Sequence, residues 1–336
     1  MPFFALLIAS LLFGLSPAYA EPITIRIATV APDGSPWAAA LDAWKKDVES
    51  RAAGRVKVKI FKGGALGDEN ESLQATKRGQ IQGVGATTGA IASLVPEVNV
   101  LELPYLFNTA QEADHIIDNV IGENLKKHFY ERGLVVGFWS ENGFRSFGGK
   151  MPIQTLADLK GKKMRSQENP IHISTYRAFG ASPVPIPITE TLTSLQTGVV
   201  DGFDNTLLYT FAASWQSAIK HFSITQHIYQ PAAIVFNRGQ YDSWPADIRQ
   251  LVLEAGNRVV KDLRRQIRDM EPILIENLRS AGVQVNTLGP AELVAFQRAG
   301  EQVRLEYMTK ATPNEKALYG QITKGMKDFR SQAGKK

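Results

Sequence analysis

The sequence predicts an α/β fold in two domains, and three observations lead to this prediction. The chain has 336 residues, the length of about two ordinary domains. Segments that alternate apolar and polar residues are followed by segments with helical spacing, and this order repeats, as in a parallel sheet with helical crossovers. One helical pattern, residues 245–280, would reach about 50 Å and could lie along both domains.

The first part of the chain shows the alternation most clearly. Residues 23–30 read ITIRIATV, an alternating and β-branched pattern that predicts a strand. The next predicted elements are a helix over 37–52, a strand over 56–61, a helix over 68–78 and a strand over 82–86. A glycine follows each of these helices, as is common at helix C-termini.

The later elements follow the same style. The predicted elements are strands over 134–138 and 163–166, a helix over 189–197 and a long strand over 224–236. We expect this last strand to be interrupted near Pro231 and to cross between the domains. Pro272 lies inside the long helix and predicts a kink there. The polar, basic tail after Gly325 is expected to fray.

The N-terminus has the pattern of an export signal. Residues 3–15 are apolar or small, Ser16 and Pro17 break the run, and Ala18-Tyr19-Ala20 fits a cleavage site. No Lys or Arg precedes the run, which is unusual for such a signal. A buried N-terminal helix is the less favoured alternative. We therefore predict a signal peptide over residues 1–20, cleaved after Ala20, and an exported, soluble product.

Composition and charge exclude several classes of protein. The net charge is +5, but the basic residues are scattered, which argues against a nucleic-acid partner. The charge is better explained by mild attraction for an anionic ligand or a membrane surface. The sequence has no cysteine, which excludes disulfides, thiolate metal sites and a cysteine nucleophile.

A search for catalytic or metal-binding patterns finds no complete set. The five histidines include no pair at i, i+4, and neither a G-x-S-x-G elbow nor a Walker loop occurs. The glycine loop 63–67 could place a phosphate at a helix N-terminus, but Asp68, Glu69 and Glu71 would repel it, so a tight turn is the better interpretation. The group Asp201, Asp204 and Asn205 fits no calcium loop. We predict no catalytic residue, cofactor or metal.

Two arginines among small and polar residues remain as candidates. Arg145 lies in Asn142-Gly143-Phe144-Arg145-Ser146, and Arg165 ends a predicted short strand. A guanidinium matches a carboxylate with two parallel hydrogen bonds and stays charged when it is desolvated. Spacing alone nevertheless favours ordinary surface ion pairs for both.

A resemblance to a known family changes this weighting. The chain resembles the substrate-binding proteins of tripartite ATP-independent periplasmic (TRAP) transporters, of the C4-dicarboxylate-binding type, over essentially all of its length after the signal. The segments that carry the resemblance are 143–145, 152–165, 190–205, 63–67, 96–97, 103–107 and 226–229. Their order and spacing together make the signal specific.

The resemblance implies a periplasmic-binding-protein-like fold, with two α/β lobes that close on a ligand cleft and a long helix spanning both. We assign residues 21–142 and 231–270 to the first lobe and residues 143–230 and 271–336 to the second. It further implies a monomeric periplasmic protein that delivers a small organic acid to the small and large membrane subunits of a TRAP permease.

The resemblance also implies the site residues. Arg165 would bind the ligand carboxylate, Arg145 would be a second cationic contact, and Asn205 would lie beside Arg165. The weaker assignments in the first lobe are Glu69, Thr87 and Thr88. Family members often have an aromatic residue where this chain has Ile188, so Phe203, Tyr209 or Trp215 would cover the ligand, although each could equally belong to the core.

Two other functions remain open. An exported organic-acid enzyme would need a general base near Arg165, for which Glu168 and His172 are the nearby candidates, with His172 on the following helix. A sensory protein would present its closed form to a receptor kinase. We favour transport, with the identity of the acid undetermined.

Overall fold

The computed structural model describes residues 21–333, so the predicted signal peptide lies outside the described residues. Within them the strands form one mixed sheet in the order β2-β1-β3-β8-β4-β7-β5-β6, with β9 beside β8. The strands are β1 Ile23–Thr29, β2 Val56–Phe61, β3 Gly83–Thr87, β4 Leu134–Gly149, β5 Lys163–Ser166, β6 Ser182–Pro185, β7 Gly202–Asn205, β8 His221–Asn237 and β9 Gln284–Thr287.

The helices of the first part are α1 Pro36–Arg51, α2 Glu69–Lys77, α3 Thr88–Ile91, α4 Ala110–His115 and α5 Gly122–Glu131, with a 3-10 helix η1 Pro96–Glu102 and a π-helix η2 Ile116–Ile121. The later helices are α6 Leu156–Leu159, α7 Pro170–Ala178, α8 Thr191–Thr197, α9 Leu207–Ala212, α10 Arg238–Ser243, α11 Ala246–Ser280, α12 Pro290–Lys310 and α13 Pro313–Ala333, with 3-10 helices η3 Ile188–Glu190 and η4 Trp215–Ala218. Each of the five elements predicted for the first part is present.

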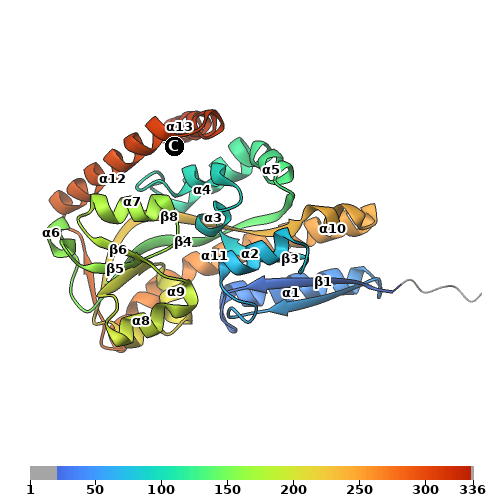
Figure 1. Cartoon of the computed structure of the whole chain (residues 1–336), viewed down its shortest axis with the longest axis horizontal. Coiled ribbons are helices and arrows are strands. Elements are labelled where there is room, and N and C mark those ends of the chain that lie inside the picture. Colours follow the sequence, from blue (N-terminus) through green and yellow to red (C-terminus); the bar gives the residue numbers. More distant parts are fainter. Residues whose placement is uncertain (1–20, 334–336) are drawn as a thin grey trace, which may run out of the picture.

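The sheet divides into two halves joined by a pair of long strands (Figure 1). In one half β2, β1 and β3 are parallel, and in the other β7, β5 and β6 are parallel. β4 and β8 are antiparallel to each other and pass through both halves, because β3 adds to one end of β8 and β7 to the far end of β4. We call the β2-β1-β3 half with the helices that follow its strands the first lobe, and the β7-β5-β6 half the second. The expected two-lobed α/β fold is confirmed.

β8 crosses between the lobes without a break, so the expected interruption near Pro231 is wrong. Pro231 pairs with Glu141, and the register of β4 shifts between Glu141 and Gly143. A proline has no N–H for the ladder, and such a bulge leaves a position unpaired, so the strand accommodates it there. Gly143 has φ 112°, a conformation that favours glycine, so the bulge also explains this residue.

The long predicted helix is confirmed as α11, and it runs unbroken through Pro272. It contacts α1 and β4 on one side and α9 and β9 farther along, so it lies along both lobes. Its buried apolar residues recur at helical spacing and include Leu251, Leu263, Ile267 and Leu278. Through this packing, both halves of the sheet contact the same helix.

The expected fraying after Gly325 is wrong for residues 326–333, because α13 continues to Ala333; residues 334–336 lie outside the described residues. Its residues Leu318, Ile322 and Met326 are buried in a core that they share with η1 and η2, and Arg330 makes two hydrogen bonds, of 2.7 and 2.9 Å, to Glu112. Burial of this apolar face offsets the entropy of ordering the tail. α12 packs on α7, so the last two helices extend from the second lobe onto elements of residues 96–121, which the expected division places in the first lobe.

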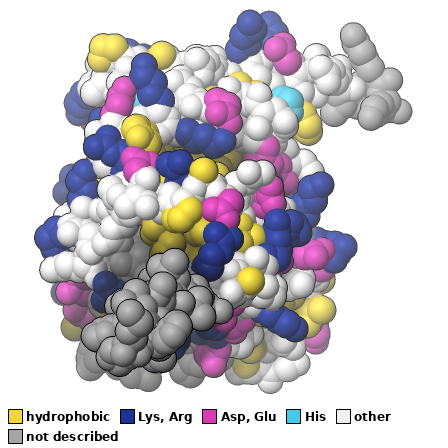
Figure 2. Space-filling view, turned by 90° about the vertical axis from the view of Figure 1, so that its right-hand side faces the viewer, with side chains coloured by type: hydrophobic (Ala, Val, Ile, Leu, Met, Phe, Trp, Pro, Cys, Tyr) yellow, Lys and Arg dark blue, Asp and Glu magenta, His cyan; other side chains and the backbone are white. Residues whose placement is uncertain are grey.

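Capping side chains fix the helices that border the cleft. Asp68 and Glu71 form a capping box at the start of α2, which sets the position of Glu69 in its first turn. Asn169 caps α7 by accepting hydrogen bonds from two backbone N–H groups. On the face shown in Figure 2, basic and acidic side chains are interspersed around a hydrophobic patch, as expected from the scattered charge of the sequence.

Candidate functional site

Two adjoining cavities lie where the lobes face each other. The larger, of about 400 Å³, is lined by the ends of β1 and β3 in the first lobe and by Ile188 and Tyr209 in the second. The smaller, of about 230 Å³, shares Glu69 and Ile188 with it and adds Arg165. The carboxyl ends of parallel strands are the usual ligand-binding edge of such sheets, and β1, β3 and β5 all end here.

Arg165 is a buried cation without a carboxylate partner among the described residues. It is the penultimate residue of β5, is 2% exposed, and donates from Nε to the carbonyl oxygen of Ile186 at 2.9 Å. Neither Nη atom donates to any of the residues that the structure describes. Burial, and next the nearby charge of Arg145, lower the pKa of Arg165. An anion placed at this guanidinium would relieve that cost.

Arg145 is equally buried, at 2% exposed, but it is already neutralised. It donates to both carboxylate oxygens of Asp204, at 2.6 and 3.0 Å, and to Oε1 of Gln230 at 2.7 Å. Burial opposes the charge of Asp204, yet Arg145 and the hydrogen bonds hold the pKa of Asp204 well below its usual range. Arg145 lines neither cavity within residues 21–333.

Asn205 is completely buried and lines neither cavity within residues 21–333, but it contacts Asn142, a residue of the larger cavity. Its Oδ1 accepts from Nδ2 of Asn142 at 3.2 Å and from the backbone N–H of Thr206 at 2.8 Å, which fixes the amide orientation. Its Nδ2 is then buried without a partner among the described residues. Asn142 lines the larger cavity. A ligand oxygen is the kind of acceptor that would satisfy this donor.

Glu69 and Thr87, two of the residues predicted as first-lobe contacts, form a polar corner of the larger cavity in the structure. The backbone N–H and the hydroxyl of Thr87 donate to Glu69, at 2.7 and 2.9 Å, and both residues line the larger cavity. Burial raises the pKa of Glu69 to about 7. Near neutral pH this carboxyl therefore exists in both states, and it can accept from or donate to a ligand hydroxyl.

Three predicted site residues have different placements. Tyr209 lines the larger cavity. Thr88 is fully buried, bonds to Glu102 and to the carbonyl of Pro231, and lines neither cavity within the described chain. Phe203 is also fully buried and packs edge-on against Trp215, with ring centroids 4.8 Å apart. As a correction, Phe203 and Trp215 belong to the core, the second of the two alternatives that the sequence left open.

Several residues that line these cavities were not among the predicted site residues, and Trp37, Asn142 and Gln167 are examples. Trp37 lines the larger one and donates from Nε1 to the carbonyl of Glu141 at 2.8 Å. Asn142 lines it too, and Gln167 lines the smaller one. Signals were available: Trp37 follows the turn after the first strand, Asn142 begins the Arg145 motif, and Gln167 comes directly after β5.

The two candidate general bases are placed differently. His172 lies on α7, as predicted, but is fully buried and lines neither cavity within residues 21–333. Glu168 lines the smaller cavity and accepts a hydrogen bond from Asn70 at 2.8 Å. Across the described residues, no group of three or more His, Cys, Asp or Glu side chains could hold a metal ion. The arrangement is suited to holding an anion.

Comparison with known families decides the identity of this fold and site. Residues 27–311 match the model of the bacterial extracellular solute-binding proteins, family 7, known as DctP. The chain belongs to this family. A "solute-binding protein" of Verminephrobacter eiseniae is 35% identical over 82% of this chain and 83% of its own length. The 2,3-diketo-L-gulonate-binding periplasmic protein YiaO of Escherichia coli is 30% identical over 76% and 78%, respectively.

A solved structure of a solute-binding protein is also similar to this chain. The sugar acid binding protein DctPAm of Advenella mimigardefordensis, in complex with galactonate, superposes with a TM-score of 0.86 at 25% identity, over 91% of this chain and 99% of that one. The resemblance to TRAP solute-binding proteins is confirmed, and with it the expectation of a solute-binding protein. Among the described helices, none is both long and apolar enough to cross a membrane.

Proposed function

We propose that this family 7 protein captures a small hydroxylated monocarboxylate between its lobes and delivers it to a TRAP permease. The observation that carries the proposal is the guanidinium of Arg165, which is buried beside the cleft without a carboxylate partner among the described residues. Its two free Nη atoms match the two oxygens of one carboxylate. The unpaired Nδ2 of Asn205 supports the same ligand group.

The charge distribution favours one carboxylate over two. Arg145, the second cationic candidate, is held by Asp204. A second carboxylate would instead extend toward Glu69, where a like charge is unfavourable. The named ligands of two similar proteins, 2,3-diketo-L-gulonate and galactonate, are compatible with this, since each carries one carboxylate.

The remainder of the cleft fits a hydroxylated chain. Glu69 and Thr87 offer hydrogen-bonding oxygens on one side of the larger cavity, and Val30, Trp37 and Ile188 supply apolar surface. A small sugar acid or a branched hydroxy acid presents both kinds of surface. Family members often have an aromatic residue where this chain has Ile188. We assign the role of that aromatic residue, covering the ligand, to Tyr209.

Binding would be coupled to closure of the lobes. An unpaired arginine in a closed cleft is costly, so an anion shifts the equilibrium toward the closed form. The division into residues 21–142 with 231–270 and 143–230 with 271–336 places the hinge at the β4–β8 crossing, where Asn142, Gly143, Gln230 and Pro231 lie. The last helix, α13, would then move with the first lobe, since it packs there.

Membership of the family supports a proposal for the compartment and the membrane partners of this protein. We propose a monomeric periplasmic protein, exported by the signal at residues 1–20 and cleaved after Ala20, whose closed form is recognised by the small and large membrane subunits of the permease. No catalytic step is proposed. Of the two candidate general bases, His172 is buried away from both cavities, and Glu168 lines the smaller one, where it accepts a hydrogen bond from Asn70.

A matched set of ligands tests the proposal. Galactonate, galactarate and galactitol share one carbon skeleton and carry one, two and no carboxylates. We expect galactonate to raise the thermal midpoint of unfolding most, because ligand bound to the native state alone stabilises it in proportion to RT ln(1 + [L]/Kd). Galactitol should have no effect, and galactarate less than galactonate. A larger shift with galactarate would contradict the monocarboxylate proposal.

A further inference from the structure

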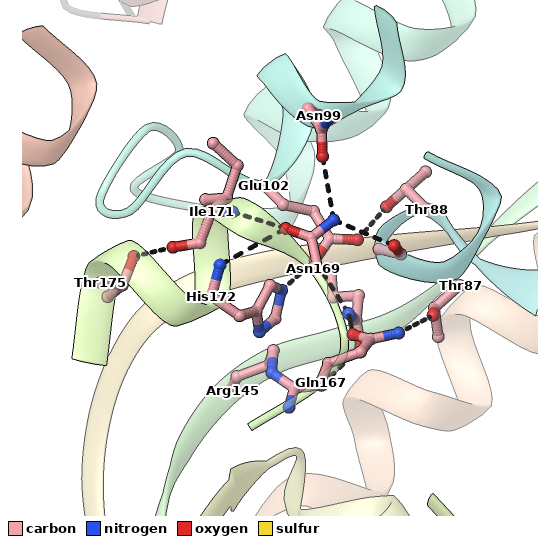
Figure 3. Close-up of polar contacts among 12 residues, drawn as sticks. Thr87, Thr88, Asn99, Glu102, Arg145, Gln167, Asn169, Ile171, His172 and Thr175 are labelled. Carbon is pink, nitrogen blue, oxygen red and sulfur yellow. Dashed lines mark hydrogen bonds and ion pairs between the residues drawn. The ribbon is translucent and has the colours of Figure 1, made fainter. Parts of the chain in front are cut away.

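A group of buried polar side chains joins the two lobes outside the ligand cavities (Figure 3). Glu102 lies at the end of η1 in the first lobe, and His172 lies on α7 in the second. Oε2 of Glu102 and Nε2 of His172 are 2.5 Å apart, and both side chains are completely buried. This contact therefore connects lobes that closure must bring together.

Gln230 links this contact to the arginine pair. Its Nε2 donates to Glu102 and to Oε1 of Gln167, both at 2.9 Å. Its Oε1 accepts from Arg145 at 2.7 Å and from Asn142 at 2.8 Å. These four bonds use the full capacity of the amide, so its orientation is fixed. Gln230 lies next to Pro231, at the crossing between the lobes.

Asn169 fixes the start of α7 from the same side. Its Oδ1 caps the helix, while its Nδ2 donates to the carbonyl of Gly89 and to Oδ1 of Asn99, both at 2.9 Å. Gly89 and Asn99 belong to the first lobe. The helix that carries His172 is thus held at its N-terminus by the opposite lobe, as the dashed contacts in Figure 3 show.

Two of the hydrogen bonds of Glu102 come from residues outside its own lobe, so opening of the lobes would expose them to water. Glu102 keeps a partner from its own lobe, Thr88, but its remaining bonds come from His172 and Gln230. When the lobes separate, water can replace these bonds; while they are closed, water is excluded. Removing His172 alone would therefore leave a buried carboxylate short of a hydrogen bond in the closed form only.

We propose that Glu102, His172 and Gln230 form a latch that sets how long the cleft stays closed, without contact with the ligand. The latch rests on the proposed function, since it presumes capture by closure, and the three are positioning residues. None of the three lines either cleft cavity within the described residues. His172 also lies 3.8 Å, through Nδ1, from Asp204, so the latch adjoins the arginine pair.

The test follows opening and closing directly. The chain has no cysteine, so a Ser50→Cys, Thr197→Cys pair places one dye on each lobe at exposed sites. Single-molecule energy transfer then gives the closed-state dwell time, without ligand and with about 1 mM galactonate. We expect His172→Leu to shorten the dwell time about tenfold or more and to leave the closing rate unchanged.

Two further variants keep the result decisive. His115→Leu makes the same substitution on α4, outside the latch, and should match the parent protein. Glu102→Gln keeps the side-chain shape and should shorten the closed-state dwell time less than His172→Leu does. If circular dichroism shows that His172→Leu is unfolded, Glu102→Gln takes its place in the test. An unchanged dwell time in the folded variant overturns the latch. Failure of galactonate to favour the closed form would instead count against the proposed ligand, because the ligand-free dwell times still test the latch.

Discussion

Arg145 and Arg165 lie in the same lobe and are equally buried, each 2% exposed, but their surroundings differ. Arg145 meets both oxygens of Asp204, and Gln230 as well. Arg165 meets one backbone carbonyl and otherwise faces a cavity. The protein thus compensates the buried positive charge of Arg145 internally and leaves that of Arg165 for a partner from outside.

The electrostatics of the pair agree with this division. Burial opposes the charge of Arg145, yet Asp204 raises its pKa above the usual value. For Arg165, burial and then the charge of Arg145 lower the pKa. A compensated arginine contributes to the fold, whereas an uncompensated one costs folding free energy that a ligand can recover. Four predictions test this contrast.

The largest effect should come from removing the charge that compensates Arg145. Asp204→Asn leaves a buried cation without its carboxylate, and we expect the free energy of unfolding to fall by about 3–5 kcal/mol. Urea denaturation of the ligand-free protein measures it. Asp262→Asn is the matched control, because its partner Arg265 is on the surface, and it should change stability by less than about 1 kcal/mol. Equal effects of the two would refute the contrast.

Removing Arg165 should lower the affinity for the ligand and leave the stability of the ligand-free protein intact. Arg165→Met should weaken carboxylate binding by about 2–5 kcal/mol, because a desolvated charge contact is lost. The unfolding free energy of the ligand-free protein should not fall, since Arg165 has no carboxylate partner within residues 21–333. Calorimetric titration and urea denaturation measure the two quantities. Arg177→Met, on the exposed side of α7, is the control; unchanged affinity in Arg165→Met would remove Arg165 from the site.

A substitution of Phe203 should have a smaller effect, and it distinguishes a core residue from a cleft residue next to Arg165. Phe203 pairs with Arg165 in the sheet register but packs in the core against Trp215. Phe203→Leu should lower the free energy of unfolding by about 1 kcal/mol through imperfect packing. Its affinity for the ligand should equal that of the parent protein. A loss of affinity without a loss of stability would return Phe203 to the binding site.

The smallest effect concerns the charge of Glu69 near Arg165. Burial raises the pKa of Glu69 to about 7, above that of the unfolded chain. Its contribution to stability is therefore fully present at low pH and is lost as pH rises through about 7. The neutral carboxyl also repels an anion less, so affinity should rise by about 1 kcal/mol or less from pH 8 to pH 6. Calorimetric titrations with ligand at both pH values measure the change in affinity. In Glu69→Gln the affinity should change little between the two pH values. An equally large change in that variant would show that a group other than Glu69 causes the pH dependence.

Local pattern predicted the elements of the first part to within about one residue at each boundary, because alternation, helical spacing and capping residues are local properties. It failed where distant contacts decide. The strand through Pro231 continues because β4 supplies a bulge opposite it. Residues 326–333 are helical because η1 and η2 cover the apolar face of α13.

The sequence by itself determined the α/β alternation, the long helix, the absence of cysteine chemistry and, through the order and spacing of several motifs, the family. Only the tertiary structure decided that Arg145 is neutralised, that Phe203 is core and that Trp37, Asn142 and Gln167 border the cleft. The physical reason is that a buried charge is defined by what faces it. Asp204 lies 59 residues from Arg145 along the chain, and the pairing of β4 with β7 brings them together.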